Sequence, residues 1–162
     1  MVLQERDMKQ INEMKYPIMA IMIGIQGSGK STFCRAHLGG FKRINLDTLH
    51  TRNKENIEIN EAIAEKKNLV IDNTNPTVEE RAKYILKGKA AGYKIIAFFM
   101  QSKLQDCIAR NEQREGNERI SNKAIACTSN KLEIPAYDEG FEKMYFVSIE
   151  DGKFKIQDWR KE

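Results

Sequence analysis

Short apolar segments alternate along this chain with longer segments in which apolar residues recur every three to four positions. Unbroken apolar segments of about four to eight residues are typical of buried strands, and the longer period is typical of helices. The expected strands are 18–23, 42–46, 68–71, 94–100 and 143–149, with a short last one at 154–156. The expected helices are 32–38, 55–67, 75–91, 103–115 and 121–132. This alternation predicts an α/β fold, with βαβ units around a parallel sheet that helices cover on both faces.

Capping residues mark where several of these helices begin and end. Asn75 can cap a helix and Pro76 suits the first helical position, so a helix is expected to start there and to stop at Gly92. Ser121 is expected to cap the helix that runs to about Leu132.

Composition and charge are those of an ordinary globular chain. Its 162 residues fit one domain, 1–162, and 41% hydrophobic with 31% charged residues allows a core under a charged surface. No apolar run reaches the roughly 18 residues that a membrane span needs, so no membrane partner is expected. The first residues are polar and lack a signal segment, so we interpret 1–15 as an extension and expect a cytoplasmic location. The net charge of +4 permits a phosphate-bearing partner without requiring one.

Residues 24–31 form a complete G-x-x-x-x-G-K-[ST] phosphate-binding loop between an expected strand and an expected helix. Its glycines allow backbone N–H groups to turn toward a polyphosphate, and the N-terminus of the following helix favours anions. Lys30 can reach the β- and γ-phosphates, and the Ser31 hydroxyl can ligate Mg²⁺. The residues expected to contact the nucleotide are Gly27, Ser28, Gly29, Lys30, Ser31 and Thr32. The loop therefore predicts that the chain binds ATP, or another nucleoside triphosphate, with Mg²⁺.

Two aspartates follow expected strands, Asp72 after 69–71 and Asp47 after 42–46. Because the carboxyl ends of parallel strands lie at one edge of a sheet, both should share a crevice with the phosphate loop. We interpret Asp72 as an acidic residue of the Mg²⁺ shell, the alternative being a turn residue. Asp47 can accept a proton from an acceptor hydroxyl as a general base, and it can equally cap a helix.

Three arginines, Arg110, Arg114 and Arg119, stand in or near an expected helix–loop–helix. A guanidinium can brace the negative charge that gathers on phosphate oxygens during transfer. Arg110 and Arg114 share one helix face, and Gly116 breaks the helix after them. We therefore interpret 110–120 as a mobile lid. The alternative is a solvated face whose arginines pair with neighbouring glutamates.

Taken in order, these segments resemble the kinase domain of the polynucleotide 5′-hydroxyl kinase family, as found in polynucleotide kinase/phosphatase repair enzymes of the P-loop NTPase superfamily. The resemblance covers about residues 18–149 and rests on 24–32, 44–49, 70–76, 81–84, 110–111 and 134–141. A large superfamily shares the phosphate loop. The segment Asp72-Asn73-Thr74-Asn75-Pro76 with Arg81 downstream is much more specific.

The resemblance implies a fold and a reaction. The fold is an adenylate-kinase-like P-loop sheet of five parallel strands with a helical lid. The reaction transfers the ATP γ-phosphate to the 5′-hydroxyl end of DNA or RNA. Asp47 is then the general base and Lys30 a phosphate ligand in catalysis. Arg119, or Arg114, is the lid arginine on the ATP phosphates, and Arg110 lies on the adenine side.

The resemblance also implies an acceptor side. Its expected residues are Arg81, Asn73, Asn75 and His50. Two positions depart from the family pattern, because Leu46 and His50 stand where many or some members carry an arginine. Both departures reduce the positive charge available to a polynucleotide. A kinase for a nucleotide, nucleoside or other small hydroxyl acceptor is therefore the alternative function, and a nucleotide-gated, toxin-like regulatory module is a third.

Overall fold

The structure is a computed structural model, and it describes residues 8, 9, 11 and 15–160. Most of the expected N-terminal extension, residues 1–15, lies outside the described residues. Within its described part, Met8 and Ile11 are buried in the same hydrophobic cluster as Phe33 and Ile156. These two side chains therefore contribute to the core.

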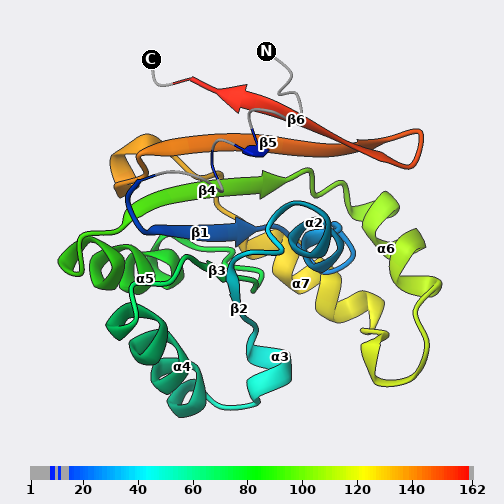
Figure 1. Ribbon diagram of the computed structural model, residues 1–162. Coiled ribbons are helices and arrows are strands. Elements are labelled where there is room, and N and C mark those ends of the chain that lie inside the picture. Colours follow the sequence, from blue (N-terminus) through cyan, green and yellow to red (C-terminus); the bar gives the residue numbers. More distant parts are fainter. Residues whose placement is uncertain (1–7, 10, 12–14, 161–162) are drawn as a thin grey trace.

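In the described residues, six strands form one sheet with helices packed around it (Figure 1). The strands are β1 (Ile18–Ile23), β2 (Lys42–Ile44), β3 (Leu69–Ile71), β4 (Lys94–Met100), β5 (Lys143–Glu150) and β6 (Lys153–Trp159). The α-helices are α2 (Lys30–His37), α3 (Leu46–Leu49), α4 (Arg52–Ala64), α5 (Val78–Ala90), α6 (Leu104–Glu112) and α7 (Asn122–Lys131). The short 3-10 segments are η1 (Gly116–Glu118) and η2 (Tyr137–Glu139). The strand order is β2-β3-β1-β4-β5-β6.

Strands β1 to β5 are parallel, which confirms the predicted α/β sheet, and β6 adds an antiparallel edge strand. β6 is longer than the expected 154–156 because its residues pair with β5 throughout although only Ile156 among them is buried. The turn between the two strands is Asp151-Gly152, and its φ angles of 52° and 72° suit the twist of a two-residue hairpin. The sheet therefore has five parallel strands, as expected, and a sixth that extends it.

The central strand β1 is buried on both faces, which explains its unbroken apolar sequence. Ile18, Ala20 and Met22 face one core cluster, and Met19, Ile21 and Ile23 face the other. The first cluster includes Phe33 of α2. The second includes Ile59 of α4 and Ile85 of α5. Helix α2 thus covers one face of the sheet, and α4 and α5 cover the opposite face.

Hydrogen bonds join the segments that follow the carboxyl ends of β1, β2 and β3. The Gly24 N–H donates to the Thr74 carbonyl at 3.0 Å, which ties the phosphate loop to the segment after β3. The Asn45 side chain donates to the Asp72 carbonyl at 2.6 Å, which ties the segment after β2 to the same place. These three strand ends therefore meet at one edge of the sheet, as the parallel topology predicts. In Figure 1 the arrowhead of β1 points toward α6 and α7.

Helix α5 begins at Val78, two residues later than the Asn75-Pro76 sequence predicts. Its cap is Thr77, whose hydroxyl oxygen accepts a hydrogen bond from the Glu80 N–H at 3.1 Å. Asn75 instead has a left-handed φ of 44°, and its side chain donates to the Met22 carbonyl of β1 at 2.8 Å. A cap residue has an extended backbone, so the left-handed Asn75, whose side chain is directed to β1, does not cap the helix.

Strand β2 ends at Ile44, earlier than predicted, and a short helix follows it. Asn45 caps α3, because its side-chain oxygen accepts from the Thr48 N–H at 3.1 Å. Asp47 therefore lies in the first turn of α3, neither as its cap nor at a strand end.

A buried ion pair fastens η2 to α5. The Arg81 side chain is 0% exposed, and its Nε lies 2.7 Å from Glu139 Oε1. A second guanidinium nitrogen donates to Glu139 Oε2 at 3.1 Å, and a third donates to the Asn75 carbonyl at 2.9 Å. Because these groups are removed from water, each depends on the other to offset its desolvation.

Arg81→Met should therefore destabilise the protein by about 3–5 kcal/mol, because it leaves the Glu139 carboxylate buried without its partner. Chemical denaturation followed by circular dichroism measures the loss. Lys83→Met on the exposed side of α5 is the control and should cost less than about 1 kcal/mol. The double variant Arg81→Met/Glu139→Met should recover much of the loss. A single-variant loss no larger than the control's would contradict the assignment.

Candidate nucleotide site

The phosphate loop connects β1 to α2 and packs directly against α6. Gly27 and Gly29 have φ angles of 82° and 96°, which favour glycine. A Cβ placed on Gly27 would lie 2.4 Å from the Cys107 carbonyl oxygen of α6. Gly27 is therefore required both by its backbone conformation and by the close approach of the helix. Helix α2 begins at Lys30, directly after this turn, so its N-terminus faces the space inside the loop.

The Lys30 side chain is buried, and its ammonium donates to the Ile25 carbonyl of the loop at 2.9 Å. Burial lowers the pKa of Lys30 to about 8. The negative charge of Asp72 opposes this lowering, and the positive charge of Arg114 adds to it. Arg114 is therefore near enough to act electrostatically on the group expected to hold the phosphates.

Asp72 is 1% exposed and lies between a hydroxyl and a guanidinium. The Ser31 hydroxyl donates to Asp72 Oδ2 at 2.9 Å, and Arg43 Nε of β2 donates to the same oxygen at 2.6 Å. A further Arg43 nitrogen donates to Ser31 Oγ at 3.1 Å. The structure thus brings the two residues expected to hold Mg²⁺ into contact, and it adds an arginine to them.

Several buried polar atoms around the loop lack a hydrogen-bond partner. They are Gln26 Oε1, Ser28 Oγ and Asp72 Oδ1. Buried oxygens without partners are uncommon in folded proteins, and hard oxygens of this kind are the donors that Mg²⁺ takes. Ser31 Oγ and Asp72 Oδ2, 2.9 Å apart, also match the edge of an Mg²⁺ octahedron, about 3 Å. The described residues contain no group of three or more His, Cys, Asp or Glu side chains placed to hold a metal. The donor set therefore fits a magnesium ion that takes its remaining ligands from nucleotide phosphates and water.

Asp47 is exposed on α3, and its position follows from the bonds of its neighbours. The Leu46 N–H donates to the Asn73 side-chain oxygen at 2.9 Å, and Asn45 bonds the Asp72 carbonyl. These bonds hold the start of α3 against the segment that carries the magnesium candidate. His50 ends α3 in a left-handed conformation, with φ 67°, and is exposed.

Three of the four residues expected on the acceptor side are engaged within the protein. Arg81 is buried in its pair with Glu139, and Asn75 bonds β1. Asn73 donates from its amide to Glu55 Oε2 at 3.0 Å and accepts from Leu46. Their side chains hold the loop after β3 in place. This placement differs from the expectation that they face an acceptor.

The expected lid has a fixed base and an exposed tip. The Arg110 guanidinium donates to the Gly27 carbonyl at 3.0 Å, so it braces the outside of the phosphate loop. Asn111 is fully buried, and its side chain bonds both the N–H and the carbonyl of Ile120, which closes the loop between α6 and α7. Arg114 is half-buried and Arg119 is exposed between these closing residues.

Four residues that build the site were not predicted from the sequence as site residues: Arg43, Asn45, Glu55 and Asn111. Glu55 is 2% exposed and accepts from the Tyr84 hydroxyl at 2.7 Å, and burial together with this carboxylate raises the pKa of Tyr84. A single polar residue on a predicted helix or strand carries no signal of burial. For Arg43 alone, the sequence contained a pattern from which its ion pair could have been predicted. Arg43 stands close to the end of one expected strand, and Asp72 follows the end of the next.

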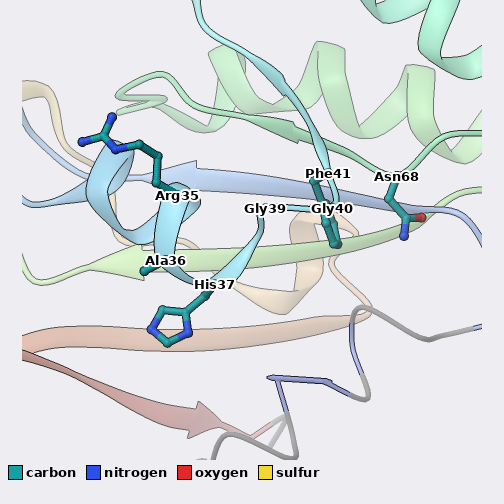
Figure 2. A pocket seen from close by; sticks show the side chains of 7 residues that line it. All are labelled: Arg35, Ala36, His37, Gly39, Gly40, Phe41 and Asn68. Carbon is teal, nitrogen blue, oxygen red and sulfur yellow. The ribbon is translucent and has the colours of Figure 1, made fainter.

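Two cavities of about 350 Å³ lie away from the phosphate loop. One is at the C-terminal end of α2, where Arg35, His37 and Asn68 line it (Figure 2). The other lies between α4 and α5, next to Glu55 and Tyr84. Neither includes a residue of the phosphate loop, so the candidate site is defined by the hydrogen-bonded residues at the strand ends and not by a cavity.

A phosphate loop at the first strand of a parallel sheet, followed by a Ser31–Asp72 pair, defines a P-loop nucleotide-binding domain. Residues 19–133 match the family model AAA_33, an AAA domain. The match covers more than half of the chain, and the chain belongs to this AAA domain family. Among the described residues, no helix is long and apolar enough to cross a membrane.

Curated relatives carry the name that the sequence analysis anticipated. The chain is 28% identical over 142 residues to "Bifunctional polynucleotide phosphatase/kinase" of Schizosaccharomyces pombe, covering 85% of this chain and 34% of the relative. It is 29% identical over 153 residues to "Putative bifunctional polynucleotide phosphatase/kinase" of Acanthamoeba polyphaga mimivirus, covering 88% and 36%. The chain therefore spans about a third of the length of each. These matches confirm the predicted resemblance to the polynucleotide kinase family.

Solved structures confirm the fold. A gluconokinase from Sinorhizobium meliloti 1021 has a TM-score of 0.57 at 17% identity, covering 83% of this chain and 84% of that one. Kti12 of Chaetomium thermophilum, solved in complex with ADP-AlF3, has a TM-score of 0.64 at 15% identity, covering 82% and 90%. The chain thus has the fold of P-loop kinases.

The lowered pKa of Lys30 predicts a pH-dependent nucleotide affinity. Bound phosphates favour the ammonium, so binding above about pH 8 requires proton uptake, and affinity should fall by up to about tenfold per pH unit there. Calorimetry with ADP from about pH 7 to about pH 9.5, in buffers of different ionisation enthalpy, measures affinity and protons together. In the free protein the sign is opposite. Stability should rise between about pH 8 and 10.5, because the unfolded chain binds more protons there.

Lys30→Arg is the control for this pH dependence, because its guanidinium keeps its charge throughout the range. A wild-type affinity that stays constant across the range, without proton uptake, would contradict the assignment.

Proposed function

We propose that the chain is an ATP-dependent kinase that transfers the γ-phosphate to the 5′-hydroxyl end of a polynucleotide. The observation that carries this proposal is the attachment of α3 to the segment after β3. The bonds of Asn45 and Leu46 hold the helix that carries Asp47 beside Asp72, at the edge of the sheet where the phosphate loop lies. An exposed carboxylate at that place is positioned to act on an acceptor that approaches the nucleotide.

The chemistry requires few groups because phosphoryl transfer depends mainly on position and charge. Ser31 and Asp72 are the residues that would hold Mg²⁺, which supplies positive charge to the phosphate oxygens when bound. Lys30 releases the Ile25 carbonyl and pairs with the phosphates. Asp47 accepts the proton of the acceptor hydroxyl as its oxygen bonds to the γ-phosphorus. The bond from that phosphorus to the bridging oxygen breaks, and ADP leaves.

Among the lid arginines, Arg114 is favoured as the group that braces the transferred phosphate. Its charge already acts on Lys30 in the free protein, and its side chain is half-buried. Arg110 is engaged with the Gly27 carbonyl, and Arg119 is exposed. These differences favour Arg114 over Arg110 and Arg119 for this role.

The polynucleotide acceptor is supported by the names of the relatives and by the ordered segments that resemble their kinase domain. A second candidate, a kinase for a small hydroxyl compound, is favoured by one observation. Asn73 and Asn75 spend their amide donors inside the protein and the Arg81 cation is paired with Glu139, so they leave few donors and little positive charge for a long acceptor. Salt separates the two acceptors. Affinity for a strand held at several phosphates falls steeply with salt, and affinity for a small neutral acceptor does not.

Asp47→Asn should lower kcat for phosphate transfer to a 5′-hydroxyl oligonucleotide by about 10²–10⁴-fold, because the amide accepts no proton. ATP affinity should change by less than about threefold, since Asp47 binds the acceptor and not the donor. Radiolabel transfer and nucleotide calorimetry measure the two quantities. Asp151→Asn, an exposed aspartate in the β5–β6 turn, is the matched control and should leave both unchanged. Loss of ATP binding in Asp47→Asn would contradict its role as the base.

Arg114→Ala should lower kcat by about 10²–10³-fold, and Arg119→Ala by less than about tenfold, because only the first removes charge close to the phosphates. Steady-state transfer assays with both variants give the comparison. The reverse order would assign the phosphate contact to Arg119, and equal small losses would show that neither arginine touches the transferred group.

A further inference from the structure

The Arg43 side chain extends from β2 to both candidate magnesium ligands, and the proposed reaction gives it no role. Its Nε lies 2.6 Å from Asp72 Oδ2, and a terminal nitrogen lies 3.1 Å from Ser31 Oγ. The guanidinium therefore bridges the two oxygens that are expected to hold the metal. A positive group thus already contacts both residues that would hold Mg²⁺.

The electrostatics explain why a cation is needed there. Asp72 is nearly fully buried, and a buried carboxylate is costly unless charge or hydrogen bonds offset its desolvation. Lys30 donates its hydrogen bond to the Ile25 carbonyl and does not contact Asp72 directly. Arg43 therefore supplies the direct positive partner of Asp72 when no nucleotide is bound.

Arg43 and Mg²⁺ would compete for the same two residues. The Ser31 hydroxyl spends its proton on Asp72 and one lone pair on Arg43, so a metal held by Ser31 and Asp72 would draw on oxygens that the guanidinium already contacts. Two positive charges would also repel at so short a distance. Metal binding would therefore favour displacement of the guanidinium.

Arg43 is free to move in this way. Its side chain is 35% exposed, whereas that of Asp72 is 1% exposed. It stands on β2, which among the described strands lies at the edge of the sheet and pairs with β3 only. Moving the guanidinium outward therefore unpacks no part of the core.

We propose that Arg43 is a tethered cation that holds Ser31 and Asp72 in register while the site is empty and gives way to Mg²⁺ when the metal–nucleotide complex binds. Arg43 is a positioning residue in this role, and the inference rests on the proposed nucleotide function. The direct consequence is competition. Arg43 keeps the site usable without metal and raises the Mg²⁺ concentration at which the metal complex forms.

Binding of ADP measured by calorimetry, in EDTA and across a series of Mg²⁺ concentrations, tests the competition without any catalytic assay. Arg43→Met should weaken ADP binding in EDTA, because Asp72 then faces the phosphates without its cationic partner. It should also lower the Mg²⁺ concentration at half-maximal effect. Together these changes raise the ratio of the Kd in EDTA to the Kd in saturating Mg²⁺ by about tenfold.

Arg35→Met is the matched control, because Arg35 is an exposed arginine of α2 that makes no hydrogen bond or ion pair with either magnesium candidate. It should leave the ratio at the wild-type value. Arg43→Gln, which is neutral but still able to donate to Asp72, is the second variant should Arg43→Met fail to fold. If Arg43→Gln raises the ratio of the two Kd values about as much as expected for Arg43→Met, the result supports competition by charge.

The outcomes separate the two proposals. Wild-type protein that binds no ADP at any Mg²⁺ concentration overturns the nucleotide function and this inference with it. Wild-type protein that binds ADP, with a ratio that neither Arg43 variant changes, overturns the inference alone. A lower melting temperature in the Arg43 variants with an unchanged ratio also overturns it, because that result assigns Arg43 a structural role only.

Discussion

The buried carboxylate of Asp72 is the constraint on which the rest of the candidate site depends. A charge with 1% exposure is retained only where partners offset its desolvation, and here a hydroxyl and a guanidinium do so from two other elements. The backbone of Asp72 is held as firmly as its side chain. Its N–H donates to the Ile44 carbonyl at 2.8 Å, and its carbonyl accepts from Asn45. The position of α3, and hence of Asp47, follows from these bonds.

The donor side and the acceptor side of the site are built differently. On the donor side, α6 meets Gly27 without room for a side chain, and Arg110 bonds the same turn from outside. This rigid contact preorganises the loop for phosphates. On the acceptor side, Asn73 and Asn75 are used to hold the chain after β3. Under the proposed function, recognition of the acceptor is therefore left to exposed groups such as Asp47 and His50.

The fold could be predicted from the sequence because its signals are local and repeated. Apolar segments gave the five parallel strands, and the phosphate loop fixed the first strand and helix around it. Strand β6 was underestimated because a mostly polar edge strand lacks that signal. The site was harder to predict because long-range bonds decide it. From the sequence, Arg81 looks like a surface cation on a helix. Its burial depends on an ion pair with Glu139, which lies 58 residues later in the chain. From the sequence, Asn75 looks like a helix cap, but its side chain donates a hydrogen bond to the Met22 carbonyl of β1. Arg43 contacts Asp72 because β2 pairs with β3 in the sheet.

The central claim is that the phosphate held by this loop moves to the 5′ end of a polynucleotide. The most direct measurement supplies γ-labelled ATP with two oligonucleotides of one sequence, one blocked at its 3′ end and the other at its 5′ end. The account predicts label on the 3′-blocked strand and none on the 5′-blocked strand. Label on neither strand, with transfer to a nucleoside or sugar hydroxyl in parallel reactions, would contradict it.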